Sequence, residues 1–498
     1  MVAPKNFLFF MISLLYIAGF FIMLGLGFVG TVHFVIGSAI YFAGSLLSLK
    51  VLESAELKKL GATTLVLFLT NLVFFSSIEL VPLVDVSFAI YWILLGNLVL
   101  LAMLNRKLDR RPFRFPYIKW VLIFLFSILL SAIFAAHIKE VIYFFVINLG
   151  AIIGFYATIY LFRDSGKSLL TMVKWLVGFG IISSVFAVWQ LYSTSFKFGL
   201  YPFIAERDQV ILELWELVSR VVGTWQHPSY LGIYLAISVP LAVYLMFYAS
   251  KNKVEAGFWG VGIIFMSATL LLTNTRSSVL AGFFGVALLY IFANFSNWEF
   301  LHRLPNVKKI AALGLLAAAG ILLYQFVFVS EIYTKPQASR VDTSATVWGR
   351  FIRSDSMSTE SLVQRSQLYS LSWEKFTESP VLGIGAKNFP YEVEDLFERG
   401  TDAHNLVLQT MAEMGIIGLA AILLLYGAIL REVYRQLKDT TGLRKKYLEA
   451  VLFASIILIL FDGIFNNPLY SLRILAIFWL LIAFSFVNSQ NIRAQNQD

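Results

Sequence analysis

One histidine has the surroundings that a general base in an enzyme requires. His404 lies in Asp402-Ala-His404-Asn405, directly before a long apolar segment that contains Gly415-Ile-Ile-Gly418. We expect Asp402 to cap a helix there, which would place the imidazole in the first turn, where the helix dipole lowers its pKa. A neutral imidazole near pH 7 can accept a proton. The alternative is that His404 only anchors the helix.

The spacing after His404 also suggests close packing. At 100° per residue, positions 404, 408, 411, 415 and 418 share one face of a helix. Two glycines on that face, Gly415 and Gly418, predict the close approach of another helix below His404.

Arginines form a second group with possible chemistry. Arg276 follows Thr273-Asn-Thr in a short loop between two apolar segments, and Arg365 lies in a longer polar segment with Arg340, Arg350 and Arg353. The planar guanidinium suits phosphate oxygens. The alternative for Arg276 is an interfacial side chain that only reaches toward water.

Two further stretches flank these arginines. Arg220 lies near the end of a predicted amphipathic helix. Its apolar stripe is Val210, Leu214, Leu217 and Val221, which predicts either a helix on a membrane surface or a lid. Gln226, His227 and Pro228 follow, and we expect Pro228 in the first turn of the next helix. In Glu378–Phe389, Gly383 and Gly385 predict a tight turn before Lys387, although the spacing does not fit a phosphate-binding P-loop.

Two carboxylates lie inside apolar segments, Glu413 and Asp462. Ionisable residues at such depth are functional candidates, and the alternative is structural pairing with Arg473. The chain has no Cys, so thiolate metal sites and disulfides are excluded. No dense carboxylate cluster calls for a divalent ion, and we expect no metal. Gly25, Gly27 and Gly30 spell a dinucleotide motif without a preceding strand, so we interpret them as helix packing.

The elements that carry these residues are membrane helices. Of the 498 residues, 59% are hydrophobic and 14% are charged, and the mean hydropathy is +0.77. This excludes a soluble enzyme, a disulfide scaffold and a disordered tail. Apolar runs predict an all-α polytopic membrane protein with about 12–14 transmembrane helices and two long outer loops. The fourteen spans are 7–28, 31–49, 61–80, 84–104, 117–136, 141–162, 171–193, 228–249, 257–273, 277–295, 310–329, 406–430, 447–463 and 471–488.

The distribution of charge gives the orientation. Loops on one side hold 25 of the 39 basic and 10 of the 30 acidic residues, so the other side is net acidic. Positive loops stay in the cytoplasm, which predicts that both termini are cytoplasmic. The net charge of +9 therefore reports topology, and we expect no nucleic-acid partner. The expected organisation is membrane helices in 1–193, an outer amphipathic loop at 194–227, helices in 228–329, a large periplasmic loop at 330–405, and helices with a short cytoplasmic tail in 406–498.

Three of these features together resemble the bacterial O-antigen ligase and O-antigen polymerase superfamily of membrane glycosyltransferases, which is similar to GT-C type enzymes. They are Arg220 with Gly223-Thr-Trp-Gln226-His227-Pro228, Arg276 in Asn-Thr-Arg-Ser-Ser, and His404-Asn405 spaced nine residues from Gly415-x-x-Gly418. The similarity covers about residues 200–430. Ligases of this family commonly have about twelve spans, fewer than the fourteen counted here.

The resemblance implies glycan transfer on the outer, periplasmic face of the bacterial cytoplasmic membrane, without metal, nucleotide sugar or other cofactor. The donor would be a glycan on undecaprenyl pyrophosphate, and the acceptor lipid A–core in a ligase or a lipid-linked glycan in a polymerase. Carried over, Arg220 and Arg276 would hold the pyrophosphate and His404 would be the base. Substrate-binding candidates are Arg220, Gln226, His227, Arg276, Arg365, Lys387, Asn405 and Glu413. Competing hypotheses are a lipid-linked glycan transporter and a non-catalytic assembly subunit.

Overall fold

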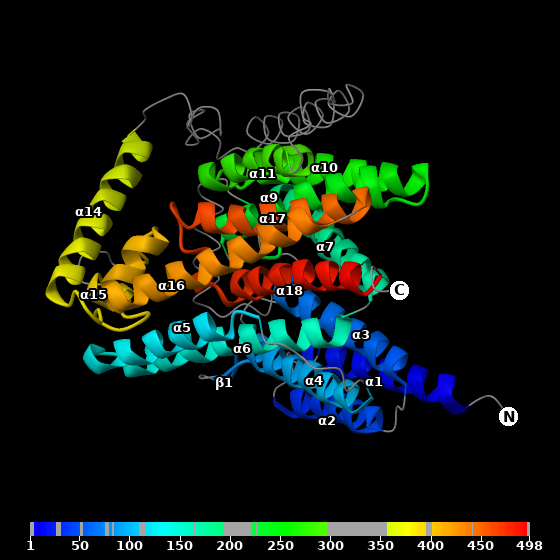
Figure 1. The fold of residues 1–498 in the computed structure, drawn as a ribbon. Helices are drawn as coiled ribbons and strands as arrows, with labels where there is room; N and C mark the ends of the chain where they lie inside the picture. Colours follow the sequence, from blue (N-terminus) through cyan, green and yellow to red (C-terminus); the bar gives the residue numbers. More distant parts are fainter. Residues whose placement is uncertain are drawn as a thin grey trace.

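The computed structural model describes residues 4–25, 31–49, 53–74, 79–81, 84–108, 116–163, 165–192, 221–225, 227–295, 356–394, 401–440 and 442–495. These residues form a bundle of long helices that run roughly side by side (Figure 1).

In the first half of the bundle, the described residues form seven helices and one short hairpin. The elements are α1 Pro4–Gly25, α2 Thr31–Ser48, α3 Ser54–Phe74, strands β1 Glu79–Val81 and β2 Val84–Asp85, α4 Val86–Leu108, α5 Ile118–Ser131 with the 3₁₀ turn η2 Ala132–Phe134, α6 Ile138–Phe162 and α7 Gly166–Tyr192. The two strands pair antiparallel.

In the second half, the part of the chain that the structure describes forms eight helices and two short helical turns. The elements are α9 Pro228–Tyr244 with the π-turn η4 Leu245–Ala249, α10 Lys253–Leu272, α11 Arg276–Phe295, α14 Ser356–Glu378, α15 Phe389–Glu392, α16 Leu406–Asp439, α17 Leu443–Asp462, the 3₁₀ turn η8 Pro468–Tyr470 and α18 Leu472–Gln495.

The all-α membrane fold predicted from the sequence is confirmed. Among the described residues, eight helices are long and apolar enough to cross a membrane, and four shorter apolar helices lie in α1, α2, α5 and α11. Together with α17, these helices match thirteen of the fourteen predicted spans. The remaining span, at 310–329, lies outside the described residues.

The bundle is arranged in three groups of helices. The pairs α1–α2 and α3–α4 pack against each other at one side, and α9, α10, α11 and α17 pack together at the other (Figure 1). Between them, α6 packs on α18 and α5 packs on α16. The first turn of α1 and the last turn of α18 lie at the same end of the bundle, whereas α14 and α15 lie at the opposite end, where α16 begins.

Local capping explains where several helices begin. Pro228 opens α9, as predicted, and the ring of His227 accepts a hydrogen bond from the Ser229 N–H at 3.1 Å. Asn252 caps α10 by accepting the Glu255 N–H at 2.8 Å. Both caps satisfy N–H groups that have no partner within the helix.

Candidate functional site

His404 lies just before α16, not in its first turn. The helix begins at Leu406, and its N-cap is Asn405, whose side-chain oxygen accepts the N–H groups of Val407 and Leu408 at 3.0 Å each. The expected capping role of Asp402 is therefore wrong. The physical reason is a left-handed backbone at His404, with φ of 52°, which turns the chain one residue before the cap.

The pKa of His404 is lowered, as expected. The causes are burial and a nearby positive charge, in place of the expected helix dipole. Removal from water by burial is the largest contribution, and the positive charge of Arg365 on α14 adds to it. The carboxylate of Asp402 acts in the opposite direction. The imidazole therefore stays neutral to lower pH than an ordinary histidine, and the neutral form is the state a proton acceptor needs.

Asp462 forms a second polar group close to Arg365. Its carboxylate accepts the side-chain amide of Asn466 at 3.0 Å, and the same amide nitrogen lies 2.8 Å from the Ser277 hydroxyl. Arg365 acts electrostatically on Asp462 as well as on His404. The sequence left open a pairing of Asp462 or Glu413 with Arg473; the contacts described for these carboxylates are with Asn466 and Tyr470, respectively.

Arg276 is the first residue of α11 and directly precedes Ser277. Its side chain is half-buried, and within the described residues it makes no hydrogen bond or ion pair. Arg276 is thus adjacent in sequence to the Ser277 member of the Ser277–Asn466–Asp462 group.

The helix α16 is broken at Gly415, which has φ of 61° and ψ of −163°. The segment 379–389 fills this break. The N–H groups of Ile384 and Gly385 donate to the carbonyls of Ala412 and Glu413 at 3.0 and 2.9 Å. In return, Ile416 and Ile417 donate to the carbonyls of Pro380 and Val381.

This exchange of main-chain hydrogen bonds explains the glycines. A Cβ on Gly383 would lie 2.2 Å from the Glu413 carbonyl carbon, and one on Gly415 would lie 2.4 Å from Val381 main-chain atoms. Gly415 also has a left-handed φ, which favours glycine. The predicted tight turn at Gly383 and Gly385 is confirmed, but Gly415 was expected to admit another helix and instead admits this loop.

Glu413 connects the inserted loop to the rest of the bundle. Its side chain is fully buried, and its two oxygens accept four hydrogen bonds. They come from the Lys387 N–H at 2.8 Å, the Phe389 N–H at 3.3 Å, the Tyr470 hydroxyl at 2.7 Å and the Gln409 amide at 3.0 Å. Glu413 therefore holds together three chain segments that are far apart in the sequence.

The turn between α5 and α6 contacts the same loop. Asn388 accepts the His137 N–H at 2.7 Å, and the ring of Tyr391 stacks on the His137 ring at 4.1 Å. The ammonium of Lys387 lies 4.6 Å from the centre of the Tyr143 ring, a cation–π contact. The positive charge at Lys387 is thus fixed at the edge of α6.

The segment preceding α9 carries the other sequence-predicted residues. Arg220 and Gln226 lie outside the described residues, as does most of the amphipathic stripe. Val221 and Val222 are fully buried and not helical. The Gln190 side chain accepts the N–H of Gly223 at 2.9 Å and fixes this segment to α7. Trp225 is buried, with the guanidinium of Arg473 5.6 Å from its ring.

Sequence reasoning missed Gln409, Asn466, Asn467 and Tyr470, which complete the polar groups around Glu413 and Asp462. One usable signal was the pair Gln409 and Glu413, because polar residues four apart on an apolar helix share a face. The hydroxyl of Tyr470 carried no local signal.

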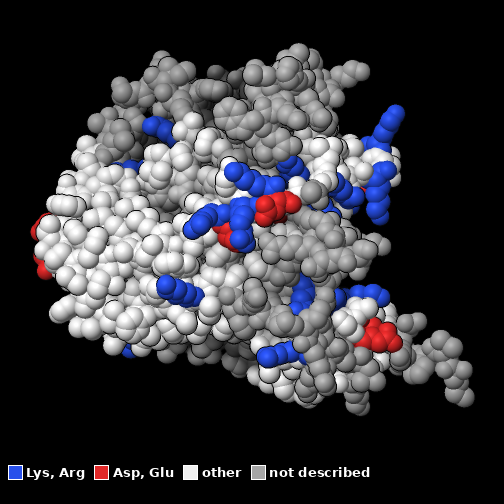
Figure 2. All heavy atoms as spheres, viewed as in Figure 1, with Lys and Arg blue, Asp and Glu red and all other residues white. Residues whose placement is uncertain are grey.

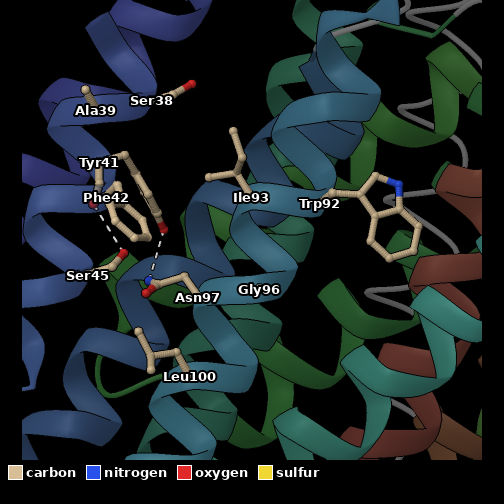
Figure 3. A pocket seen from close by; sticks show the side chains of 10 residues that line it. All are labelled: Ser38, Ala39, Tyr41, Phe42, Ser45, Trp92, Ile93, Gly96, Asn97 and Leu100. Carbon is tan, nitrogen blue, oxygen red and sulfur yellow. Dashed lines mark hydrogen bonds between the residues drawn. The ribbon is translucent and has the colours of Figure 1, made fainter. Parts of the chain in front are cut away.

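The cavity in Figure 3 lies elsewhere, between α2 and α4. Its volume is about 650 Å³, and Tyr41 and Asn97 meet in it through a hydrogen bond of 3.2 Å. No charged side chain lines it, so it offers no partner for an anionic group. Among the described residues, no group of three or more His, Asp and Glu is placed to share a metal ion.

Comparisons with known proteins identify a family resemblance. Residues 261–423 match the family described as O-Antigen ligase, and this range contains Arg276, Arg365, His404 and Glu413. A curated relative, the teichuronic acid biosynthesis protein TuaE of Bacillus subtilis (strain 168), is 27% identical over 154 residues. That match spans 29% of this chain and 29% of the relative. The resemblance is thereby confirmed: this multi-pass helical membrane protein is similar to the O-antigen ligase family over residues 261–423.

Proposed function

We propose that the protein is a membrane glycosyltransferase of surface polysaccharide synthesis. It transfers a glycan from undecaprenyl pyrophosphate to an acceptor hydroxyl on the outer face of the cytoplasmic membrane. The observation that carries the proposal is the buried His404 directly before α16, on which the positive charge of Arg365 acts electrostatically. Both lie in the family region, as does Arg276.

The proposed chemistry follows from these groups. Neutral His404 takes the proton of the acceptor hydroxyl while its oxygen forms a bond to the anomeric carbon of the donor. The bond from that carbon to the pyrophosphate oxygen breaks, and negative charge develops on the leaving group. Arginines placed before the reaction stabilise such charge without needing to reorganise, and we assign Arg276, Arg220 and Arg365 to this task.

Secondary substrate contacts are proposed at the margin of the site. Lys387 adds positive charge beside α6, and Gln226 and His227 precede α9. The side chain of Asn405 caps α16 and donates to the Ile464 carbonyl at 3.0 Å. We therefore propose that Asn405 orients the neighbouring His404. Glu413 likewise acts through the loop that it holds.

The orientation is part of the proposal. The beginning of α1 and the end of α18 lie opposite the His404 end (Figure 1). In the view of Figure 2, most visible Lys and Arg side chains gather toward the side where α1 begins. Basic ends remain in the cytoplasm, so the termini are assigned to the cytoplasm and the site to the periplasm.

Polymerase activity is the second candidate. The relative TuaE is named for the biosynthesis of teichuronic acid and not for a ligation, which favours extension of a lipid-linked glycan. A ligase would instead place the glycan on lipid A–core. A ladder of longer lipid-linked chains indicates a polymerase, and capped lipid A–core indicates a ligase.

The test is glycan transfer from a polyprenyl-pyrophosphate donor in membranes that hold the full chain. We expect His404→Ala, Arg276→Ala and Arg220→Ala each to reduce transfer by about a hundredfold or more. Arg435→Ala is the matched control, because its partner Glu432 lies on the same helix, α16, far from His404. Full activity in all three folded variants would exclude the site, and flux into liposomes without a transfer product would favour a transporter.

A further inference from the structure

Gln409 occupies the centre of the polar network below His404. Its side chain is fully buried. Its amide nitrogen donates to Asp402 and to Glu413, both at 3.0 Å, and its amide oxygen accepts the Ala403 N–H at 3.0 Å and the Asn467 side chain. A glutamine has two N–H donors and two acceptor lone pairs, so all four positions are used.

The orientation of this amide is fixed by its partners. Two carboxylates, Asp402 and Glu413, lie on the nitrogen side, and two N–H donors lie on the oxygen side. Rotation of the amide by 180° would point oxygen at both carboxylates and N–H at both donors. Gln409 is therefore a rigid connector and not an adaptable side chain.

The segment that Gln409 holds needs such a connector. Asp402 and Ala403 directly precede His404, which has a left-handed φ of 52°. A residue with a side chain adopts this backbone only when its surroundings impose it. Two of the bonds of Gln409, to the Asp402 carboxylate and the Ala403 N–H, fix the two residues before that turn.

We propose that Gln409 is the positioning residue of the site, which holds Asp402 and Ala403 so that the His404 imidazole stands in place beside Arg365. This role rests on the proposed function of His404 as the base. Through Glu413, the same connector ties His404 to the loop that fills the break in α16.

The charged groups around His404 come from several elements. The charges of Arg365 on α14 and of Asp402, two residues before His404, both act on the imidazole. Arg365 also acts electrostatically on Asp462 at the end of α17. When Gln409 is removed, the Asp402 carboxylate loses its amide donor and turns toward the imidazole. The pKa of His404 then rises, because a nearby negative charge favours the protonated ring.

The test uses diethyl pyrocarbonate, which modifies neutral imidazoles, on the purified full chain in detergent. Modification of each histidine is followed by peptide mass spectrometry across a pH series. For Gln409→Leu, we expect the rate at His404 on the high-pH plateau to rise about threefold or more as its segment loosens, and the midpoint to shift to higher pH. His227 is the internal reference and keeps its rate.

Gln436→Leu is the matched control. Gln436 is a buried glutamine on the same helix, and it bonds to Ser485 at 3.0 Å, far from His404. It should lower stability comparably without changing the rate or midpoint at His404. The proposal is overturned when Gln409→Leu leaves both values as in the unmodified protein, or when Gln436→Leu changes them equally.

A second pair of variants covers the case in which Gln409→Leu does not fold. Asp402→Leu removes the hydrogen bond between the Gln409 amide and residue 402 by changing the half-buried partner. We expect it to raise the plateau rate at His404 about threefold. Asp402→Asn keeps an acceptor for Gln409, so the plateau rate stays and only the midpoint moves, to lower pH. An unchanged plateau in Asp402→Leu contradicts the proposal.

Transfer assays add the catalytic consequence. We expect Gln409→Leu to lower kcat about tenfold or more while KM for the donor stays within about twofold, because positioning of the base, not donor binding, is lost. Absence of transfer in the unsubstituted protein would defeat the proposed function, whereas the labelling result would still decide the role of Gln409.

Discussion

The helix α16 contributes to two buried carboxyl clusters, one near each end, and they are built differently. Near its start, Glu413 accepts two main-chain N–H groups of the inserted loop together with Tyr470 and Gln409. Near its end, Gln436 joins Glu449 of α17 with Ser485 and Asn488 of α18, through side chains of three regular helices. The first cluster supports irregular backbone, and the second only joins helices.

The two clusters differ in whether they satisfy main-chain groups that lie outside regular helices. Regular helices satisfy their own main-chain groups, so the Glu449 cluster can change without freeing backbone donors. The Glu413 cluster carries donors that have no helix to satisfy them. Disturbing it should therefore affect both stability and the site that contains His404.

The largest effect is expected at the glycines of the inserted loop. Gly415→Ala or Gly383→Ala places a Cβ within 2.4 Å of main-chain atoms, at a left-handed φ. We expect a loss of about 3 kcal/mol or more of stability and loss of transfer. The measurement is thermal unfolding in detergent, followed by tryptophan fluorescence.

Gly427→Ala is the matched control on the same helix. A Cβ there meets nothing within 4 Å, and alanine favours a helix over glycine by about 0.5–1 kcal/mol. It should leave stability equal or higher. Equal losses at Gly415 and Gly427 would mean that the break in α16 has no structural role.

The next prediction compares the two carboxyl clusters by the hydrogen bonds that each carboxylate accepts. Each oxygen of Glu413 accepts two hydrogen bonds, so Glu413→Gln points an NH₂ group at donors in either orientation. We expect a loss of about 1–3 kcal/mol in thermal unfolding, together with reduced transfer.

Glu449→Gln is the contrasting variant. Its new NH₂ can donate to Ser485, which donates to Gln436, while its oxygen still accepts from Asn488. We expect a change within about 0.5 kcal/mol. A larger loss at Glu449 than at Glu413 would reverse the comparison.

Helix capping gives a smaller contrast between the two ends of the bundle. Asn405→Ala removes two cap bonds to α16 and the bond to the Ile464 carbonyl, for which we expect about 1–2 kcal/mol. Asn252→Ala removes one cap bond of α10 and should cost about 0.5–1 kcal/mol. Denaturation midpoints of the two variants, measured side by side, check the order.

The smallest effect is a shift in pH dependence. In the proposed mechanism His404 acts when neutral, and its lowered pKa keeps it neutral to lower pH, so we expect transfer to be lost only when pH falls below that pKa. Arg365 helps to lower it. In Arg365→Gln, the pKa of His404 rises, and the acidic limb of the plot of kcat against pH moves to higher pH, although burial of His404 still opposes its protonation. Arg435→Gln should leave the limb unmoved.

Most of the helices could be predicted from the sequence, because each apolar run satisfies its own backbone within the membrane. His404 and the arginines could be found from residue type and spacing. The break at Gly415 could not, because a glycine in an apolar span looks the same whether a helix or a loop approaches it. The left-handed turn at His404, which moves the cap from Asp402 to Asn405, depends on partners such as Gln409 that lie beyond the local pattern.

The exchange of main-chain hydrogen bonds between 379–389 and the break in α16 also limits how the chain can be rearranged. A chimera joined at residue 405 would take the 379–389 segment from one relative and the break in α16 from another, although each satisfies main-chain groups of the other. Exchanges between relatives should therefore keep a stable fold only when residues from α14 through the first half of α16 are replaced together.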